Sequence, residues 1–534
     1  MIKTHLTVLE DVASKSARSA AFRIPELDTS SNRVKSWTTI TYEEFYRDVE
    51  TFAKYWTQIL GSNNIPQRSI IGVWLSGFLY TDVLHIYGLS RAGYVPQLFS
   101  IRLPNPIVIY ELMRRAGASA LVHDPSFSNI LGDSPYFTHA AEDVRRLDLQ
   151  HLRLRPLPDV TSEDLAFVFH TSGSTSGSPK LVRANYRWLS SALEKSHHLC
   201  YPCSPQRQDV TVFMGSMCHI AQNFMFLGTL QHGACTVQPT VLKYSPEELK
   251  DMVTRCGLNR LNQFASFLGN QLRASRQDSR LLSMLISLDD VVYSGLPLPR
   301  EEEQYAYKHG IKIRNLFGST EVGAMLLSGG CERNLSLVAP LPGTSYRFVP
   351  TASKSEQNQS AHRSNAELFE LVILSESPDC PDVSLRHADG HFHTGDLFQE
   401  VMSGFYLYRG RDDDWIKSEN SLRCDTKAIE DNARAMCGTL IAECVVVGTG
   451  RPSPVMFIEP GLEMNQDKLK KDIFRKIRLF HSRRYLHEQI VSPDMIVVVA
   501  KSTLPRTATK GNIRRQAVEE MFRLQIDDIF ARVR

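Results

Sequence analysis

One stretch decides the fold of this chain: Phe167-Val168-Phe169-His170-Thr171-Ser172-Gly173-Ser174-Thr175-Ser176-Gly177-Ser178-Pro179-Lys180. It begins in an apolar run, Leu165 to Phe169, that predicts a buried strand, and a helical pattern follows from Tyr186 to Leu199. Between the two, glycines let several backbone N–H groups face one point, hydroxyls add neutral donors, and Lys180 supplies a charge for phosphate oxygens. The sequence therefore predicts a strand, an anion-binding loop and a helix, in that order.

Two other interpretations of this loop are weaker. A flexible linker has the same Ser/Gly composition, but linkers are not bracketed by a buried strand and a helix, as phosphate loops are. A P-loop NTPase requires G-x-x-x-x-G-K-[ST], whereas Gly173 and Gly177 enclose only three residues and Lys180 is followed by Leu181. A different type of nucleotide loop is predicted.

The loop resembles that of the adenylate-forming superfamily, which contains acyl-CoA synthetases, luciferases and the adenylation domains of nonribosomal peptide synthetases. That loop reads roughly [YH]-T-S-G-[ST]-T-G-x-P-K, and this chain carries one additional residue, Ser176 or a neighbour. Among its members, the chain is most similar to fungal synthetase-like and carboxylate-reductase-like adenylation domains. The resemblance implies that ATP or AMP is bound by Thr171, Ser172, Gly173, Ser174, Thr175, Ser176, Gly177 and Lys180.

The composition of the whole chain excludes several classes of protein. Its 534 residues are too many for one core, and 22% charged with 42% apolar residues is ordinary for a folded globular protein. The net charge of +3 gives no electrostatic argument for nucleic acid or a membrane as a partner. No apolar run approaches the length of a membrane span, and a signal-peptide core is missing, so a cytoplasmic location is expected.

Two groups of cysteine and histidine could suggest a metal site, and both are weak. Cys200 and Cys203 follow His197 and His198, but the chain has no second C-x-x-C, and ligands so close in sequence rarely close a tetrahedron. The segment 391–393, His-Phe-His, puts two rings on one face of a strand but lies where the superfamily has an ordinary strand. Zinc is therefore not predicted at either place.

Strands alternate with helices along most of the chain, which predicts an α/β fold with doubly wound sheets. The predicted strands are 69–75, 94–99, 118–123, 165–169, 210–215, 234–238 and 290–294, and the predicted helices are 41–61, 79–91, 106–115, 186–199, 223–230 and 246–255. After these comes a smaller α+β unit with helices at 425–436 and 467–479 and strands at 443–447, 455–458 and 495–500. We predict a large N-terminal adenylation domain over 1–409 and a small, mobile C-terminal domain over 410–534.

A second motif, 315–323 (NLFGSTEVG), resembles the superfamily's Y-G-x-T-E. The resemblance implies that Phe317 stacks on adenine, Thr320 contacts phosphate and Glu321 helps to hold Mg²⁺, since a hard dication that bridges phosphates prefers carboxylate oxygen. By the same resemblance, Thr320 and Glu321 are catalytic. The remaining nucleotide-binding residues of this region are Gly295, Asn315, Gly318 and Ser319.

Two later motifs complete the nucleotide site that the resemblance implies. Asp396, in H-T-G-D-L, matches the aspartate that accepts hydrogen bonds from both ribose hydroxyls, a pairing that suits a carboxylate. The segment 409–417 (RGRDDDWIK) resembles G-R-x-D-D-x-I-K, in which Arg411 binds the nucleotide and Asp413 is the hinge between the two domains. Without the neighbouring motifs, three adjacent aspartates would be interpreted as a solvated turn.

The chain also carries a counterpart of the superfamily's terminal motif P-[KR]-T-x-x-G-K-[IV]-x-R. Here the order is lysine then glycine, at Lys510-Gly511, and Lys510 is the only lysine of the segment. The resemblance implies that Lys510 bridges the acid's carboxylate and the α-phosphate in the adenylation step. The alternative is one basic residue on a solvated face, which is where most lysines lie.

These motifs imply that a carboxylate attacks the α-phosphorus of ATP and yields an acyl-adenylate and pyrophosphate. In the superfamily a thiol, phosphopantetheine of a carrier protein or coenzyme A, then takes the acyl group, which makes a carrier-protein domain a possible partner. Asn420 stands where the superfamily usually has a glycine near the thiol tunnel. Because of this departure, the additional loop residue and the Lys510-Gly511 order, a catalytically weak nucleotide-binding or scaffold protein stays as the alternative.

The acid is specified only by class. In domains that activate amino acids, an aspartate in F-D-x-S pairs with the substrate ammonium, whereas the corresponding stretch here, 216–223 (SMCHIAQN), has no acidic residue. Burying an ammonium without a counter-charge is costly, so an aryl or aliphatic acid without an α-amino group is expected. We place His219, Phe267 and Gly323 in the substrate pocket. Phe224, Phe264 and Met325 are further candidates, although such residues are more often plain core.

Overall fold

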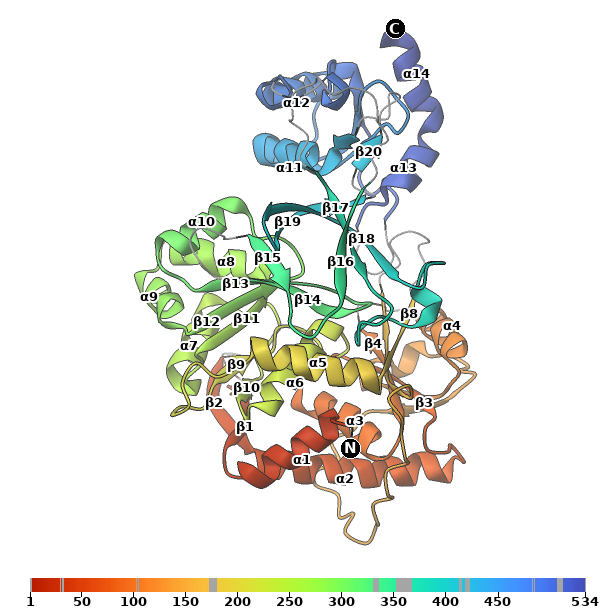
Figure 1. Ribbon diagram of the computed structural model, residues 1–534, viewed down its shortest axis with the longest axis vertical. Helices are drawn as coiled ribbons and strands as arrows, with labels where there is room; N and C mark the ends of the chain where they lie inside the picture. The colour runs from red at the N-terminus through yellow and green to blue at the C-terminus, as the bar shows by residue number, and fades with distance from the viewer. Residues whose placement is uncertain are drawn as a thin grey trace.

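The computed structural model describes residues 2–28, 30, 33–101, 103, 105–171, 180–329, 336–351, 367–412, 415–417, 423–482, 484, 486–506 and 512–533. The elements that follow residue 412 gather at one end of the molecule together with the C-terminus, and α1 to α3 lie at the opposite end with the N-terminus (Figure 1). The α/β architecture with a large and a small unit is therefore confirmed.

A six-stranded sheet carries the phosphate-loop region. Its strand order is β6-β5-β3-β4-β7-β8, and all neighbours are parallel except β7 and β8. The strands are β3 (Ile70–Leu75), β4 (Val95–Ser100), β5 (Ala118–His123), β6 (Phe137–Ala140), β7 (Leu165–His170) and β8 (Leu181–Asn185). In β3, Ile71 and Val73 join the core with helices α2 and α3, while Ile70 and Trp74 join the core with α4. Helices thus cover both faces, as a doubly wound sheet requires.

The structure corrects the expectation that the phosphate loop leads directly into a helix. Residues Leu181–Asn185 form β8, which pairs antiparallel with β7 at the edge of the sheet. The alternation in this segment explains the difference, because Val182 and Ala184 are buried while their neighbours are partly exposed. Helix α5 begins only at Tyr186, where Asn185 caps it by accepting a hydrogen bond from the Trp188 N–H.

Two further sheets complete the large unit. A four-stranded sheet has the order β2-β1-β10-β9 and contains β1 (Ala20–Leu27), β2 (Val34–Thr41), β9 (Val210–Val212) and β10 (Cys235–Val237). A nine-stranded sheet has the order β11-β12-β13-β14-β15-β19-β18-β17-β16. Its strands are β11 (Arg260–Phe264), β12 (Asp290–Ser294), β13 (Ile313–Ser319), β14 (Gly323–Ser328), β15 (Leu337–Pro340), β16 (Tyr346–Pro350), β17 (Phe369–Ile373), β18 (Phe392–Met402) and β19 (Phe405–Arg411). It is parallel over β11 to β13 and antiparallel beyond.

The helices of the large unit are amphipathic or wholly buried. They are α1 (His5–Lys15), α2 (Tyr42–Ser62), α3 (Tyr80–Arg91), α4 (Pro106–Ala116), α5 (Tyr186–Leu199), α6 (Ile220–Gln231), α7 (Pro246–Cys256), α8 (Ala265–Ser275), α9 (Ser279–Ser287) and α10 (Arg300–Lys308). Helix α2 begins with a capping box, in which Thr41 accepts from the Glu44 N–H and Glu44 accepts from the Thr41 N–H. None of the helices in the described part of the chain combines the length and apolar character that crossing a membrane requires.

The small unit has a core of its own, made only of residues between Ile416 and Phe530. Its elements are β20 (Trp415–Lys417), β21 (Arg423–Asp425), β22 (Ile441–Val447), β23 (Val455–Pro460), β24 (Ile496–Val498), α11 (Thr426–Cys437), α12 (Gln466–His481), α13 (Arg515–Met521) and α14 (Arg523–Val533). A separate apolar core is what an independent domain needs. The boundary between Arg409 and Gly410 stays a prediction.

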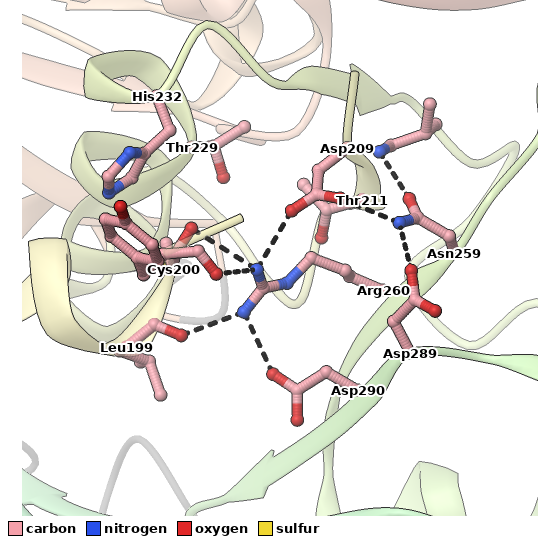
Figure 2. Close-up of polar contacts among 12 residues, drawn as sticks. Leu199, Cys200, Asp209, Thr211, Thr229, His232, Asn259, Arg260, Asp289 and Asp290 are labelled. Atoms are coloured by element: carbon pink, nitrogen blue, oxygen red, sulfur yellow. Dashed lines mark hydrogen bonds and ion pairs between the residues drawn. The ribbon is translucent and has the colours of Figure 1, made fainter. Parts of the chain in front are cut away.

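A buried guanidinium joins three elements of the large unit (Figure 2). Arg260, at the start of β11, is 7% exposed and donates to Asp209 at 2.9 Å and to Asp290 at 3.0 Å. It also donates to backbone carbonyls at and just beyond the end of α5: Leu199 at 2.8 Å, Cys200 at 3.3 Å and Tyr201 at 2.8 Å. The carbonyls of Leu199 and of the C-cap residue Cys200 are among those that a helix leaves unpaired at its C-terminus. One side chain therefore fixes the end of α5 against β11 and β12.

Candidate active site

The two residues assigned to the ribose lie opposite each other on neighbouring strands. Asp396 of β18 pairs in register with Arg411 of β19, and Asp396 Oδ1 lies 3.7 Å from Arg411 Nη1. Asp396 is 5% exposed, and its backbone N–H donates to Thr394 Oγ1 at 3.0 Å. A carboxylate has two acceptor oxygens, which is the number that the two hydroxyls of a diol require. The structure thus brings together two residues that lie fifteen positions apart in sequence.

An aromatic residue to which the sequence analysis gave no role connects this pair to the predicted adenine site. Tyr408 donates from its hydroxyl to Asp396 Oδ1 at 3.4 Å, and its ring centroid lies 5.2 Å from that of Phe317. Phe317 also meets Phe398 edge to face at 5.2 Å. Since Tyr408 precedes Arg411 on the strand that opposes Asp396, hairpin pairing of these strands was the signal that could have found it. Phe317, Tyr408 and Asp396 form one continuous group.

Glu370 of β17 holds the segment of β18 that presents Asp396. Its Oε1 accepts from the Gly395 N–H at 3.0 Å, and its Oε2 accepts from His393 Nδ1 at 3.1 Å. His393 donates from Nε2 to Asp389 at 2.9 Å, so both ring nitrogens face carboxylates. Burial alone would lower the pKa of His393, but the hydrogen bonds to Asp389 and Glu370 outweigh burial and raise the pKa above 6.5. His393 is a structural ion-pair partner in this segment of β18.

The raised pKa of His393 predicts a pH-dependent contribution to stability. The protonated ring stabilises the fold fully below about pH 6.5, the unfolded value, and this contribution is lost as the pH rises through the higher folded value. We expect His393→Gln to lower the melting temperature by about 1 °C at pH 6 and by less at pH 8.5, as measured by differential scanning calorimetry. His309→Gln serves as the control, because His309 contacts a backbone carbonyl of α10 rather than a carboxylate. An equal shift at both pH values would contradict the assignment.

The turn that carries Thr320 and Glu321 joins β13 to β14 in a tight hairpin. A Cβ atom on Gly318 would lie 2.6 Å from the Gly323 carbonyl oxygen, so the two strands meet at a distance that only glycine allows. Gly323 has a φ of +88°, which also favours glycine. Ser319 Oγ is buried and has no hydrogen-bond partner among the described residues. Glu321 projects from a backbone that is fixed on both sides.

These groups fit the Mg²⁺ that the resemblance implies. Mg²⁺ prefers oxygen ligands, and proteins usually bind it through one or two carboxylates together with substrate phosphates. The turn offers the Glu321 carboxylate, which makes no hydrogen bond or ion pair within the described part of the chain, and, two residues earlier, the buried Ser319 hydroxyl, which has no hydrogen-bond partner there. This donor set suits a metal shared with a nucleotide rather than a closed protein site.

The described ends of the phosphate loop are held together. The Thr171 N–H donates to the Lys180 carbonyl at 3.1 Å, and the Lys180 N–H donates to Thr171 Oγ1 at 3.2 Å. Immediately before the loop, the His170 ring stacks on the Phe99 ring, with ring centroids 4.4 Å apart. Burial lowers the pKa of His170 to about 4. Glu321 and residues 182–185 of β8 line one hollow of about 110 Å³. The strand that leaves the phosphate loop therefore lies beside the turn that carries Glu321.

The residues assigned to the acid are only partly brought together. A Cβ atom on Gly295 would lie 3.1 Å from the Phe264 ring, and one on Gly215 would lie 3.0 Å from it, so Phe264 lies between these two backbones. The Phe267 ring packs edge to face against the Phe264 ring, with ring centroids 6.1 Å apart. His219 is exposed at the start of α6. Of the further candidates, Phe224 and Met325 lie in the apolar cores, as plain core residues do.

Several predicted site residues lie outside the described residues: Ser172, Gly173, Ser174, Thr175, Ser176, Gly177, Asp413 and Lys510. Their roles stay predictions. In the described part of the chain, no group of three or more His, Cys, Asp or Glu is arranged to hold a metal ion. Cys200 in particular is buried, which raises the pKa of its thiol to about 11.

Comparison with known proteins gives the family. Residues 10–360 match the model of the AMP-binding enzyme family, and residues 413–534 match that of the AMP-binding enzyme C-terminal domain. The AMP-binding domain-containing enzyme iboA of Amanita muscaria is 34% identical over 515 residues, which cover 94% of this chain and 98% of that protein. The non-canonical nonribosomal peptide synthetase ascB of Acremonium egyptiacum is 21% identical over 84% of this chain and 40% of its own length.

Solved structures share the fold. The ATP-bound MatB of Rhodopseudomonas palustris superimposes with a TM-score of 0.72 at 17% identity, covering 98% of this chain and 99% of that one. The chain belongs to the AMP-binding enzyme family, and the adenylate-forming ligase class predicted from the motifs is thereby confirmed.

Proposed function

We propose that this protein activates a carboxylic acid with ATP and Mg²⁺ to an acyl-adenylate and then transfers the acyl group to a thiol. The observation that carries the proposal is the continuous group of Phe317, Tyr408, Asp396 and Arg411, which joins aromatic stacking surface to a ribose-binding carboxylate. The hairpin that contains Phe317 also presents Glu321. In this proposal the base, ribose and phosphate ligands of one nucleotide all come from the nine-stranded sheet.

In the adenylation step, a carboxylate oxygen of the acid forms a bond to the α-phosphorus, and the bond from that phosphorus to the bridging oxygen of pyrophosphate breaks. No protein nucleophile is required, because positioning and charge stabilisation supply most of the catalysis in such transfers. Asp396 and Arg411 hold the ribose, Phe317 stacks on adenine, and Thr320 and the hydroxyl loop donate to the phosphates. When bound, Mg²⁺ neutralises phosphate charge, and Lys510 supplies a positive charge to the acid and the α-phosphate.

The finer features of the proposal concern the substrate and the acceptor. The segment 216–223 lacks an acidic side chain, which supports an aryl or aliphatic acid without an α-amino group. The acceptor is phosphopantetheine of a carrier protein or coenzyme A, and the small domain turns about Asp413 to admit it. The relatives include a synthetase and CoA ligases, which supports both acceptors. The proposal places the protein in the cytoplasm.

The experiment is acid-dependent exchange of labelled pyrophosphate into ATP, measured with aryl, aliphatic, keto and amino acids, each with and without Mg²⁺. We expect exchange with one class of acid, at least tenfold above the acid-free rate, that is lost without Mg²⁺. Coenzyme A and a phosphopantetheine carrier are then compared as acceptors by mass spectrometry. ATP binding without exchange for any acid would overturn the proposal and favour the nucleotide-binding scaffold.

A further inference from the structure

Two side chains of α5 reach the backbone of the hairpin that presents Glu321. Trp188 donates from Nε1 to the Val322 carbonyl at 2.9 Å, and Lys195 donates from Nζ to the Ala324 carbonyl at 2.6 Å. Residues 188 and 195 are seven positions apart, so they lie on the same face of the helix two turns from each other. The two carbonyls flank Gly323. The helix therefore holds the backbone on both sides of that glycine.

The Lys195 ammonium has a fixed position. It is 1% exposed and pairs at 2.7 Å with Asp379, which is 0% exposed. Asp379 in turn accepts from Ser377 Oγ at 2.6 Å and from the Tyr346 hydroxyl. A buried ion pair is retained only when its remaining hydrogen bonds are supplied, and here the Ala324 carbonyl is one of them. The ammonium thus acts as a rigid donor to β14.

The indole of Trp188 also limits where the turn can lie. A Cβ atom on Gly323 would lie 3.4 Å from Trp188 Cζ2, so the backbone runs directly against the ring. On the opposite side of the hairpin, Gly318 and Gly323 approach as closely as backbones allow. Glu321, two residues before Gly323, therefore extends from a backbone segment that has little freedom to move.

We propose that Trp188 and Lys195 are positioning residues that orient Glu321 toward the metal of bound MgATP. This inference rests on the proposed function. Helix α5 follows β8, the strand that leaves the phosphate loop, so one helix connects the phosphate-binding and metal-binding segments. Groups outside the ligand shell that orient a ligand change metal affinity about 10–100-fold when removed. A backbone contact two residues from the ligand belongs at the lower end of that range.

The test compares Trp188→Phe with Trp37→Phe. Both keep an aromatic ring and remove an indole donor, but Trp37 donates to Asp251 between β2 and α7, away from the hairpin. The dissociation constant of ATP is measured by calorimetry with Mg²⁺ and with EDTA, and the ratio of the two gives the affinity gained through the metal. We expect Trp188→Phe to reduce this gain about tenfold and to leave the value in EDTA within about twofold. Trp37→Phe should change neither.

Lys195 is tested with Lys195→Arg and Lys195→Met, with melting temperatures measured alongside. Lys195→Met leaves Asp379 buried without its cation, so the double variant Lys195→Met/Asp379→Leu is the interpretable one if the single variant fails to fold. We expect whichever of Lys195→Met and Lys195→Met/Asp379→Leu folds to lose Mg²⁺-dependent affinity for ATP, as Trp188→Phe does. The change measured for Glu321→Gln is the reference for complete loss of Mg²⁺-dependent affinity for ATP.

The outcomes separate the inference from the function on which it rests. If wild type gains no ATP affinity from Mg²⁺ and Glu321→Gln changes nothing, the proposed function fails. If wild type and Glu321→Gln behave as expected but Trp188→Phe matches Trp37→Phe, only the positioning role fails. A Trp188→Phe variant that loses ATP affinity equally with Mg²⁺ and with EDTA has a general structural defect, which also overturns the positioning role.

Discussion

Replacing Arg260 with methionine should destabilise the large unit by about 3–5 kcal/mol, the cost of removing one partner from a buried ion pair. Methionine fills part of the space but donates no hydrogen bond, so Asp209 loses its cation. The carbonyls of Leu199, Cys200 and Tyr201 lose their shared donor as well (Figure 2). For a unit of roughly 400 residues, the melting temperature should fall by about 4–6 °C in differential scanning calorimetry.

Two variants control for this expectation. Arg207 also pairs with an aspartate of the same region, Asp289, but its side chain is 55% exposed, and Arg207→Met should cost no more than about 1 kcal/mol. Adding Asp209→Asn to Arg260→Met should recover part of the loss, because Asp209 then carries no unpaired charge, while Asp290 keeps Arg314. A melting temperature for Arg260→Met equal to that of Arg207→Met would contradict the interpretation that buried Arg260 fixes the end of α5 against β11 and β12.

Local sequence was sufficient to predict most elements of the fold. The capping box at Thr41 and the apolar run 69–75 each contain their own signal, and both form the elements that they predict. Boundaries were less predictable: the strand expected over 210–215 ends at Val212, and the Gln222 side chain accepts from the N–H groups of Met214 and Gly215. The partner of those N–H groups lies in the next helix, where no pattern within the strand could indicate it.

The candidate active site shows the same difference between features that local sequence predicts and features that depend on long-range contacts. Asp396 and Arg411 were predicted through motifs, and the structure places them as cross-strand neighbours. Tyr408 was missed because its role depends on hairpin register, and β8 was missed because a five-residue edge strand directly before a helix gives little periodic signal. Lys195 was not predictable either, since its counter-ion Asp379 lies 184 positions away. Motifs identify ligands, but long-range contacts decide how those ligands are held.

The largest expected effect on activity is that of Asp396→Asn, which should lower kcat/KM for ATP about 100-fold or more in pyrophosphate exchange. Each hydrogen bond from a ribose hydroxyl to a charged acceptor is worth about 1.5–3 kcal/mol, and the amide replaces one acceptor oxygen with a donor. The loss should appear mainly in the KM for ATP, and calorimetry should show it in the binding of AMP as well. The fold should tolerate the change, because asparagine has nearly the same shape and Arg411 can turn to solvent from its partly exposed position.

Glu400→Gln is the matched control for Asp396→Asn, because it makes the same carboxylate-to-amide change on the same strand. Glu400 is exposed near the far end of β18, where it accepts from the Gly404 N–H and lies within hydrogen-bonding reach of the Tyr406 hydroxyl. Its effect on kcat/KM should stay below about threefold, as for an exposed side chain outside the site. If Asp396→Asn fell in the same range, the ribose could not lie on the Asp396 and Arg411 pair, and the nucleotide would have to be placed elsewhere on the sheet. If only the acid's KM rose, the pair would belong to the acid pocket instead.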